Sequence, residues 1–452
     1  MEEEAIPRLL LRFAAPALAG MLANALYNIV DRIFVGHTVG AGGIAAIALC
    51  YPFMLFLFSV AFLIGVGGGS RISILLGEKR HAAAEHTLGN AFAMALVAAL
   101  VLGASGRAFL DDILRLSGAS ETLLPMASAY LSIILYGVFF STMSFVLSWQ
   151  IRAAGSPTYA MGSQISGALA NVALDAWFVF YRGMGVEGAA IATVIGQIVS
   201  FCWALSYFWL PRAAIRLRLR NMLRVDWAAV RRILAVGTPS CLVNLNFVLV
   251  HALVTNTSSA YGGDLAVSAT GIFMSLDSLL FMPAIAIAEA CQPIVGYNYG
   301  AGRIERVVRT VKTGMLATTA FYLLSFTTVM LAAEYLVMMF NSDDAALLAL
   351  AAGAIRVGNA GIPLMGISVI STSFLQGMGR GRDGLLLAAV RFGIFLWIPL
   401  LTLPKHFGVY GAWGSFPVSD ICGSIIAGLF VRHTVANLRR KDADKKEPLA
   451  AA

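Results

Sequence analysis

Apolar runs of about 20 residues recur along the whole 452-residue chain. Each run is long enough to cross a bilayer as an α-helix, because a helix rises 1.5 Å per residue and the hydrocarbon core is about 30 Å thick. Such a chain must satisfy its backbone hydrogen bonds within helices, since the core contains no water. We expect twelve spans, at residues 9–35, 43–70, 88–106, 126–150, 159–181, 188–210, 230–258, 265–295, 311–333, 351–377, 384–403 and 409–432.

The composition agrees with an all-α polytopic membrane protein. Hydrophobic residues make up 59% of the chain and charged residues only 12%, whereas soluble domains carry about 25% charged residues. No polar segment is large enough to form a separate soluble domain. The composition therefore excludes a soluble enzyme.

The basic residues predict the orientation of the chain. With the N-terminus inside, only Arg107, Arg115, Arg182 and Lys405 fall in external loops, and most of the 32 Lys and Arg residues fall on the cytoplasmic side. Positive residues favour the cytoplasmic face, so we expect a multi-pass protein of the cytoplasmic (inner) membrane with both termini inside. The net charge of +8 is then explained by anionic lipid headgroups, and no nucleic-acid partner is expected.

An internal repeat divides the chain into two copies of a six-helix unit. The residue numbers of Pro16 and Pro239 differ by 239 − 16 = 223, and those of Gly77 and Gly300 differ by the same amount, which we call the repeat shift. Because six is even, both copies cross the membrane in the same direction, and parallel repeats of this kind are typical of transporters. We expect an N-lobe of helices 1–6 at 1–210, an Arg-rich cytoplasmic linker at 211–229, a C-lobe of helices 7–12 at 230–436, and a charged cytoplasmic tail at 437–452.

Four polar residues lie at similar depth in the first copy. Asp31, Asp175 and Thr193 are expected roughly 7–9 Å below the external edge, and Asn171 lies one turn deeper than Asp175 on the same helix face. An ionised Asp deep in a membrane helix costs about 2.5–3.5 kcal/mol, which favours a functional role. The pattern predicts a cation or proton site, and the alternative is a structural hydrogen-bond cluster.

The second copy provides an internal control for this prediction. The repeat shift carries the four polar positions to Val254, Ile394, Ile398 and Phe416. A cluster that served only the folding of the six-helix unit would be kept in part by both copies. The second copy keeps none of it, so we expect ion coupling.

The same residues carry a resemblance to a known family. The segment "NIVDRIFVGH" around Asp31, the NxxxD of "NVALD" with Thr193 downstream, and "QPIVGYNYGAGR" at 292–303 resemble the multidrug and toxic compound extrusion (MATE) family over nearly the whole chain. The resemblance implies a V-shaped pair of six-helix lobes that exports organic, often cationic, compounds in exchange for H⁺ or Na⁺. It also implies that the four polar residues form the coupling site.

Pro16 matches the proline that permits bending of the first helix in this family. Physically, Pro16 leaves the carbonyl of Arg12 without its usual helical donor and clashes with that turn. Pro239 repeats the proline in the second copy, where no coupling acid exists, so inherited architecture is the alternative interpretation.

Two acids of the eighth predicted span form a second candidate site. Asp277 and Glu289 are 12 residues apart and therefore lie within about 20° of one helical face. Glu289 resembles the C-lobe acid of certain bacterial multidrug members, which contacts cationic substrate or couples ions. The alternative for both acids is pairing between helices, with Arg391 or His251 as partner.

The sequence thus predicts a secondary active multidrug antiporter rather than an enzyme, with small organic, mostly cationic, substrates. The nearest alternative is a lipid-linked oligosaccharide flippase of the same superfamily. Such flippases often have cationic central cavities, whereas the buried charge here is mostly acidic. We expect no cofactor or metal beyond the coupling ion, H⁺ or Na⁺, and a functional monomer in the lipid bilayer.

Overall fold

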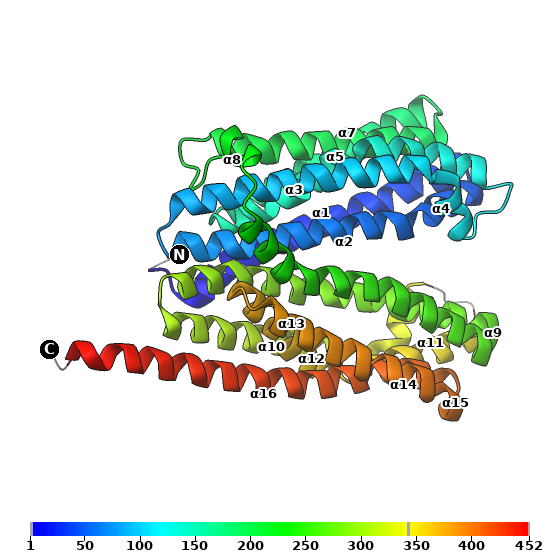
Figure 1. Cartoon of the computed structure of the whole chain (residues 1–452). Coiled ribbons are helices and arrows are strands. Elements are labelled where there is room, and N and C mark those ends of the chain that lie inside the picture. The colour runs from blue at the N-terminus through cyan, green and yellow to red at the C-terminus, as the bar shows by residue number, and fades with distance from the viewer. Residues whose placement is uncertain (1–2, 341–343, 451–452) are drawn as a thin grey trace. The chain divides into compact units, whose positions relative to one another are not determined.

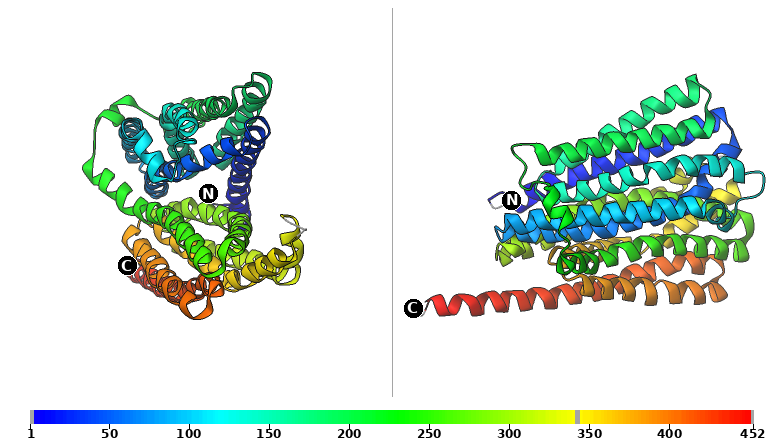
Figure 2. Two further views of the ribbon diagram at one scale, coloured as in Figure 1. Left: turned by 90° about the vertical axis from the view of Figure 1, so that its right-hand side faces the viewer. Right: turned by 45° about the horizontal axis from the view of Figure 1, so that its top comes forward.

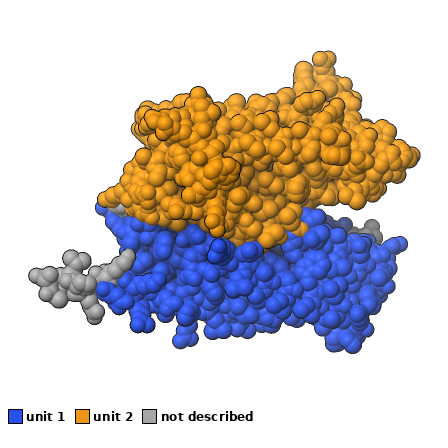
Figure 3. Space-filling model, in the orientation of Figure 1, with its two compact units in different colours: residues 1–14, 246–452 blue, residues 15–245 orange. Residues whose placement is uncertain are grey.

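The computed structural model describes residues 3–340 and 344–450. All regular structure in these two ranges is helical, which confirms the predicted all-α class. The chain forms two compact units: unit 1 comprises Met1–Ala14 and Asn246–Ala452, and unit 2 comprises Ala15–Leu245 (Figure 3).

The long helices of unit 2 lie side by side along one axis (Figure 1). Helix α5 is the core of the unit, because it packs against α2, α3, α6 and α7. The helices are α1 (Ile6–Thr38, from residue 15 on), α2 (Ala41–Gly77), α3 (His81–Ala108), α4 (Leu110–Leu116), α5 (Leu124–Ala153), α6 (Pro157–Asp175), the π-helix η1 (Ala176–Tyr181), α7 (Gly185–Ser206), η2 (Tyr207–Trp209), α8 (Leu219–Leu223) and the first turns of α9 (Trp227–Gly300).

Unit 1 is also a bundle of roughly aligned helices (Figure 2). Helix α12 packs against α10 and α16, and α16 also packs against α11 and α14. Its elements are the first turns of α1, α9 from residue 246 on, α10 (Ile304–Met338), α11 (Ala345–Gly358), α12 (Ile362–Gly377), α13 (Gly381–Ala388), the π-helix η3 (Ala389–Ile394), α14 (Trp397–Thr402), α15 (Pro404–Phe407) and α16 (Val409–Ala450).

The sequence repeat is also a repeat of backbone turns. Three pairs of residues related by the repeat shift have positive φ angles between 57° and 82°, a region that glycine enters without steric cost. The α5–α7 packing of unit 2 likewise corresponds to the α12–α16 packing of unit 1. The three pairs are Gly40 and Gly263, Lys79 and Gly302, and Gly185 and Gly408.

Nine described helices are long and apolar enough to cross a membrane, or ten if the bent pair α11 and α12 forms one span. That count takes α9 as one helix, although Gly263 (φ 62°) separates its two halves there. It also leaves out α6, which with η1 covers the predicted span 159–181. Each of the twelve predicted spans therefore has a helical counterpart in the described part of the chain.

Not every predicted span is one continuous helix, since η3 and α14, within 384–403, are separated by a turn at residues 395–396. The predicted span at 351–377 is formed by α11 and α12, which meet at a bend of 49° that the sequence did not predict. Pro363 is the reason, because it has no N–H to donate to the carbonyl of Asn359. The corresponding residue of the unbroken α5 is Phe140.

The unit boundaries differ from those of the predicted lobes. The first turns of α9 belong to unit 2, where Gly237 lies so close to the Leu63 carbonyl on α2 that a Cβ would be 1.8 Å from it. The first turns of α1 belong to unit 1, where Leu9 and Phe13 are buried in the same core as Val307. The predicted lobes follow the repeat, whereas these segments follow their packing partners.

The predicted linker and tail are helical in part. Helix α8, inside the linker, packs against α3, and Asn90 of α3 accepts a hydrogen bond from the backbone N–H of Asp226 at 2.9 Å. The described part of the tail continues α16 as a helix to Ala450, beyond the neighbouring helices of unit 1 (Figure 1). Residues 451–452 lie outside the described part.

Candidate coupling site in unit 2

The four predicted coupling residues are all buried in unit 2. Asp31 lies near the C-terminal end of α1, Asp175 is the last residue of α6, Asn171 precedes it by one turn, and Thr193 lies near the start of α7. Their exposed fractions are 6%, 0%, 2% and 7% in that order. The carboxylates, amide and hydroxyl are therefore withdrawn from solvent.

Asn171 joins α6 to α7. In one orientation of its amide, Nδ2 donates to Thr193 Oγ1 at 3.3 Å. In the flipped orientation, with Nδ2 and Oδ1 exchanged, Nδ2 donates to Asp175 Oδ2 at 3.3 Å, and Oδ1 accepts from the Thr193 backbone N–H at 3.2 Å. We assign the flipped orientation, since it gives both amide atoms a partner of the right kind.

The two carboxylates have unused acceptor capacity. Asp31 Oδ1 and Asp175 Oδ1 are buried and accept no hydrogen bond within the described part of the chain. The two groups interact electrostatically, and Arg32 is the cation that acts on Asp31. A buried anion without a partner is costly, so this arrangement favours uptake of a cation or a proton.

The α6 helix changes its winding at the site. Directly after Asp175 the chain continues as the π-helical turn η1, with Trp177 stacked on Tyr181 at 4.7 Å between ring centroids. π-Helical turns are rare and occur often at functional sites. Here the wider turn follows the residue that carries one of the two carboxylates.

Two tyrosines near the carboxylates were not predicted from the sequence. Tyr27 of α1 and Tyr130 of α5 each interact electrostatically with both Asp31 and Asp175. Tyr27 precedes Asp31 by four residues, so the helical spacing could have revealed it. Tyr130 is brought to the site only by the packing of α5, which no local pattern predicts.

A cavity of about 230 Å³ opens beside Asn171 and Thr193. Polar side chains such as Asn24, Gln164 and Gln197 line it together with aromatic ones. None of its described lining residues is charged, and the carboxylates of the site are not among them. Two lining residues lie next to the carboxylates: Asn171 donates to Asp175, and Tyr27 precedes Asp31 by one helical turn.

The predicted residues of unit 1 lie in two places. Asp277 on α9 is half-buried and interacts electrostatically with Arg391 of η3 and Asp420 of α16. Arg391 and Asp420 form a buried ion pair, with Arg391 Nη2 donating to Asp420 Oδ1 at 2.9 Å. Asp420 was not predicted, although an acid inside a span is itself a signal.

Glu289 is buried in a different part of unit 1, with an exposed fraction of 9%. It lies 12 residues beyond Asp277 on α9, about 18 Å along the helix axis. The structure therefore does not bring the two acids together. His251 lies further back on α9, where its ring packs against Phe247 at 5.8 Å.

Pro16 lies inside the continuous helix α1. The boundary between the residues of unit 1 and those of unit 2 falls at Ala14–Ala15, directly before it. The proline thus stands at the point where α1 passes from one unit to the other.

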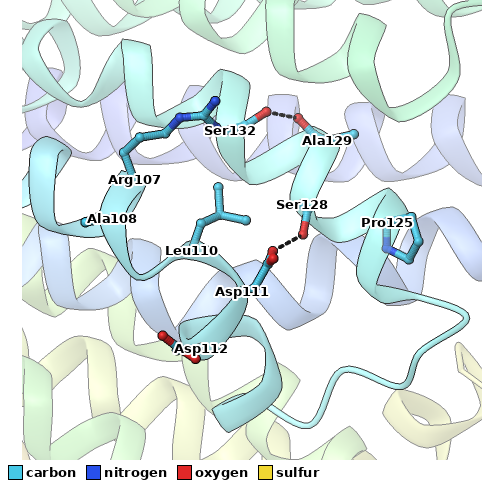
Figure 4. A pocket seen from close by; sticks show the side chains of 9 residues that line it. All are labelled: Arg107, Ala108, Leu110, Asp111, Asp112, Pro125, Ser128, Ala129 and Ser132. Atoms are coloured by element: carbon cyan, nitrogen blue, oxygen red, sulfur yellow. Dashed lines mark hydrogen bonds between the residues drawn. The ribbon is translucent and has the colours of Figure 1, made fainter.

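A larger cavity, of about 690 Å³, lies at α3, α4 and α5 and contains none of the predicted site residues. Figure 4 shows Asp111 and Asp112 of α4 at this cavity, with Ser128 donating to Asp111 at 2.8 Å. Asp111 is exposed, so its charge is solvated and calls for no bound partner.

Membrane-spanning helices, a parallel internal repeat and a buried pair of carboxylates together define a secondary transporter. The family model described as MatE matches residues 16–177 and again residues 239–400. The chain belongs to this family of ion-coupled antiporters, and the two matches begin at Pro16 and at its repeat counterpart Pro239. The resemblance, the repeat and the transporter class are thereby confirmed.

Individual relatives agree over nearly the whole length. The multidrug export protein MepA of Staphylococcus haemolyticus is 27% identical over 436 residues, which cover 96% of this chain and 95% of that protein. A crystal structure of a MATE protein in the bent conformation has a TM-score of 0.91 at 22% identity, covering 97% of this chain and 98% of that one. A transporter of Pyrococcus furiosus, described as having a binding pocket of reverse polarity and a different function, has a TM-score of 0.90 at 22% identity and covers 96% and 97%.

Proposed function

We propose that the chain is a secondary active antiporter that exports organic, mostly cationic, compounds in exchange for H⁺ or Na⁺. The observation that carries this proposal is the buried set of Asp31, Asn171, Asp175 and Thr193 beside the cavity of unit 2. The relatives named multidrug export protein support the substrate class.

The residues of the coupling site have distinct roles in this proposal. Asp31 and Asp175 bind the ion, because their free carboxylate oxygens suit a hard cation and can also take up a proton. Asn171 holds Asp175 by its amide and joins it to the backbone of Thr193. The second copy lacks these four groups, whereas groups that served only the scaffold would be needed in both copies.

Substrate binding is assigned to unit 1. Asp277 and Glu289 supply negative charge on α9, and a buried carboxylate attracts an organic cation more strongly than a neutral compound. Asp277 is the more accessible of the two acids, since it is only half-buried.

The chain acts as a monomer in the cell membrane with both termini in the cytoplasm.

A lipid-linked oligosaccharide flippase is the alternative function. A flippase must bind an anionic phosphate group, for which Arg and Lys are the favoured side-chain partners. The described lining of the unit 2 cavity contains no Lys or Arg, and Arg391 of unit 1 is already paired with Asp420. These observations favour a cationic substrate.

The test is transport of a cationic dye by purified protein in lipid vesicles, with an H⁺ gradient and a Na⁺ gradient applied separately. We expect dye movement against its own gradient with one of the two ions and none without a gradient. Transport of a lipid-linked oligosaccharide, with no dye movement under either gradient, would support the flippase instead.

A further inference from the structure

Four serines of unit 2 form a continuous line of hydroxyl groups, which we call the hydroxyl file. Ser144 and Ser148 come from α5, Ser163 from α6 and Ser200 from α7. The hydroxyls of Ser144 and Ser200 share a hydrogen bond of 2.6 Å, and those of Ser163 and Ser200 share one of 3.0 Å. Ser148 donates to Ser163 at 3.5 Å, which completes the file, and the Ser163 hydroxyl also donates to the backbone carbonyl of Ser200 at 2.9 Å.

The hydroxyl file and the coupling site open into the same cavity. Ser144, Ser148 and Ser200 line the 230 Å³ cavity together with Asn171 and Thr193. A cavity of this volume has room for several waters, each of which needs two to four polar partners, and Gln164 and Gln197 are among the polar side chains that line it beside apolar ones. The cavity thus connects the amide and hydroxyl of the coupling site with the file.

The file leads towards the end of unit 2 at which α5 and α7 end and α6 begins. Tyr159 lies one helical turn before Ser163 on the same face of α6, and its hydroxyl shares a hydrogen bond of 2.6 Å with Ser206. Tyr159 and Ser206 thus place a further pair of hydroxyls between the file and the end of these helices, which is the cytoplasmic end in the predicted orientation.

The second copy lacks this line of hydroxyls. The positions that correspond to Ser144, Ser148, Ser163 and Ser200 are Ile367, Ser371, Leu386 and Gly423. If serines were needed only for close packing of the six-helix unit, small polar residues would recur at most of these positions. Three of the four counterparts have no hydroxyl, so the file accompanies the coupling acids in one copy only.

Hydroxyl groups suit proton movement. A serine hydroxyl can donate one hydrogen bond while it accepts another, so each group can receive a proton and pass its own proton to the next. When the hydroxyls have rotated back, each serine again carries one proton, so the protein is chemically unchanged. A dehydrated Na⁺ instead needs several oxygens around it at once, and hydroxyls already bonded to each other in a line do not provide such a cage.

We propose that the hydroxyl file relays protons between the Asp31–Asp175 carboxylates and the cytoplasmic end of unit 2, so that the coupling ion is H⁺. This inference rests on the proposed function, because it concerns the ion and its route in the same antiporter. It names Ser144, Ser163 and Ser200 as the groups on that route.

The test uses two substitutions of equal shape at Ser200. Ser200→Thr keeps the hydroxyl and Ser200→Val replaces it with a methyl group, so any effect of the added bulk near Gly167 is common to both. We expect dye transport driven by an H⁺ gradient in vesicles to fall about tenfold in the Val variant relative to the Thr variant, as a barrier higher by about 1.4 kcal/mol produces. Dye affinity, measured by equilibrium binding, is expected to be equal in the two.

Ser371→Ala is the matched control, because Ser371 is the buried counterpart of Ser148 in unit 1 and keeps the H⁺-driven rate in this proposal. Equal rates of the Val and Thr variants would overturn the relay. Transport by the wild-type protein with Na⁺ alone would also overturn it and would leave the proposed antiport intact. No transport with either ion would instead contradict the proposed function itself.

Discussion

Asp175 shows how a single residue acquires its chemistry from its position. It ends α6, has no exposed surface, and receives a hydrogen bond only on Oδ2, from Asn171. Asp31 approaches it from α1 and interacts with it through space. Two anions held together in a buried region favour a cation or proton between them, and within the described part of the chain Arg32 is the cation that acts on Asp31.

Asp31→Asn and Asp175→Asn are each expected to abolish ion-coupled dye efflux. Asparagine keeps the shape of the side chain but has no charge to bind a cation or take up a proton. Efflux from dye-loaded vesicles is the measurement, with protein content checked by immunoblot. Asp111→Asn, an exposed acid outside the site, is the control and should transport normally. A near wild-type rate in either site variant would remove that residue from the coupling site.

Glu289→Gln is expected to reduce export of cations more than that of neutral compounds. The buried carboxylate attracts only a charged substrate, so its removal costs the cation a contact that a neutral compound never had. The measurement is a comparison of export rates for a cationic dye and an uncharged analogue. Glu305→Gln, at an exposed acid of α10, is the control. An equal loss for both substrates would indicate a role in coupling or folding.

At the scale of the helix, proline has different consequences at different sites. Pro363 accompanies the 49° bend between α11 and α12, whereas Pro16 lies within a single helix, α1. Pro16 also follows the boundary between the two units directly, so a bend there moves the part of α1 that carries Asp31. Asp31 is 15 residues further on, about 22 Å along the helix.

Pro16→Ala is expected to slow turnover without changing the affinity of the coupling site. Alanine restores the hydrogen bond to the Arg12 carbonyl and straightens α1, while the side chains around Asp31 stay in place. Turnover is measured as the dye transport rate and affinity as the ion concentration at half-maximal rate. Pro239→Ala in α9 is the control, since no acid lies between Pro239 and the break of α9 at Gly263. Normal turnover of Pro16→Ala would mean that Pro16 is inherited architecture only.

For the whole molecule, one scaffold supports two different interiors. Under the repeat shift, the positions of Asp277, Arg391 and Asp420 in unit 1 correspond to positions that all line the cavity of unit 2. The corresponding residues are Met54, Ala168 and Gln197, in that order. Gly423 makes room for the stem of Arg391, because a Cβ there would lie 2.8 Å from its Cγ. The positions that enclose a cavity in one copy are thus filled by an ion pair in the other.

The contribution of the Arg391–Asp420 ion pair to stability can be tested by replacing both residues with the types found at the corresponding positions of unit 2. Arg391→Ala alone should lower the free energy of unfolding by about 3–5 kcal/mol, since it leaves Asp420 as an uncompensated buried charge. The double variant Arg391→Ala with Asp420→Gln, which copies unit 2, should recover much of that loss. Thermal unfolding in detergent is the measurement. Equal stability of the single and double variants would show that the uncompensated charge of Asp420 is not the cause of the loss.

The orientation of the chain is tested by labelling of introduced cysteines in a variant without the native ones. Ser120→Cys, between α4 and α5, should react with a membrane-impermeant maleimide in intact cells, because positive-inside orientation places it outside. Ala214→Cys, in the Arg-rich linker, should react only after the cells are permeabilised. The reverse pattern would invert the predicted topology and with it the direction of the hydroxyl file.

Local patterns were sufficient for the spans, the repeat, the family and four buried polar residues, because apolar run length and depth in a helix are properties of short segments. They did not predict the break before α12, which depends on a single proline within an otherwise apolar run. Tyr130, the pairing of Arg391 with Asp420 and the hydroxyl file were decided by tertiary structure. Their members lie on different helices, and only packing determines which faces of those helices meet.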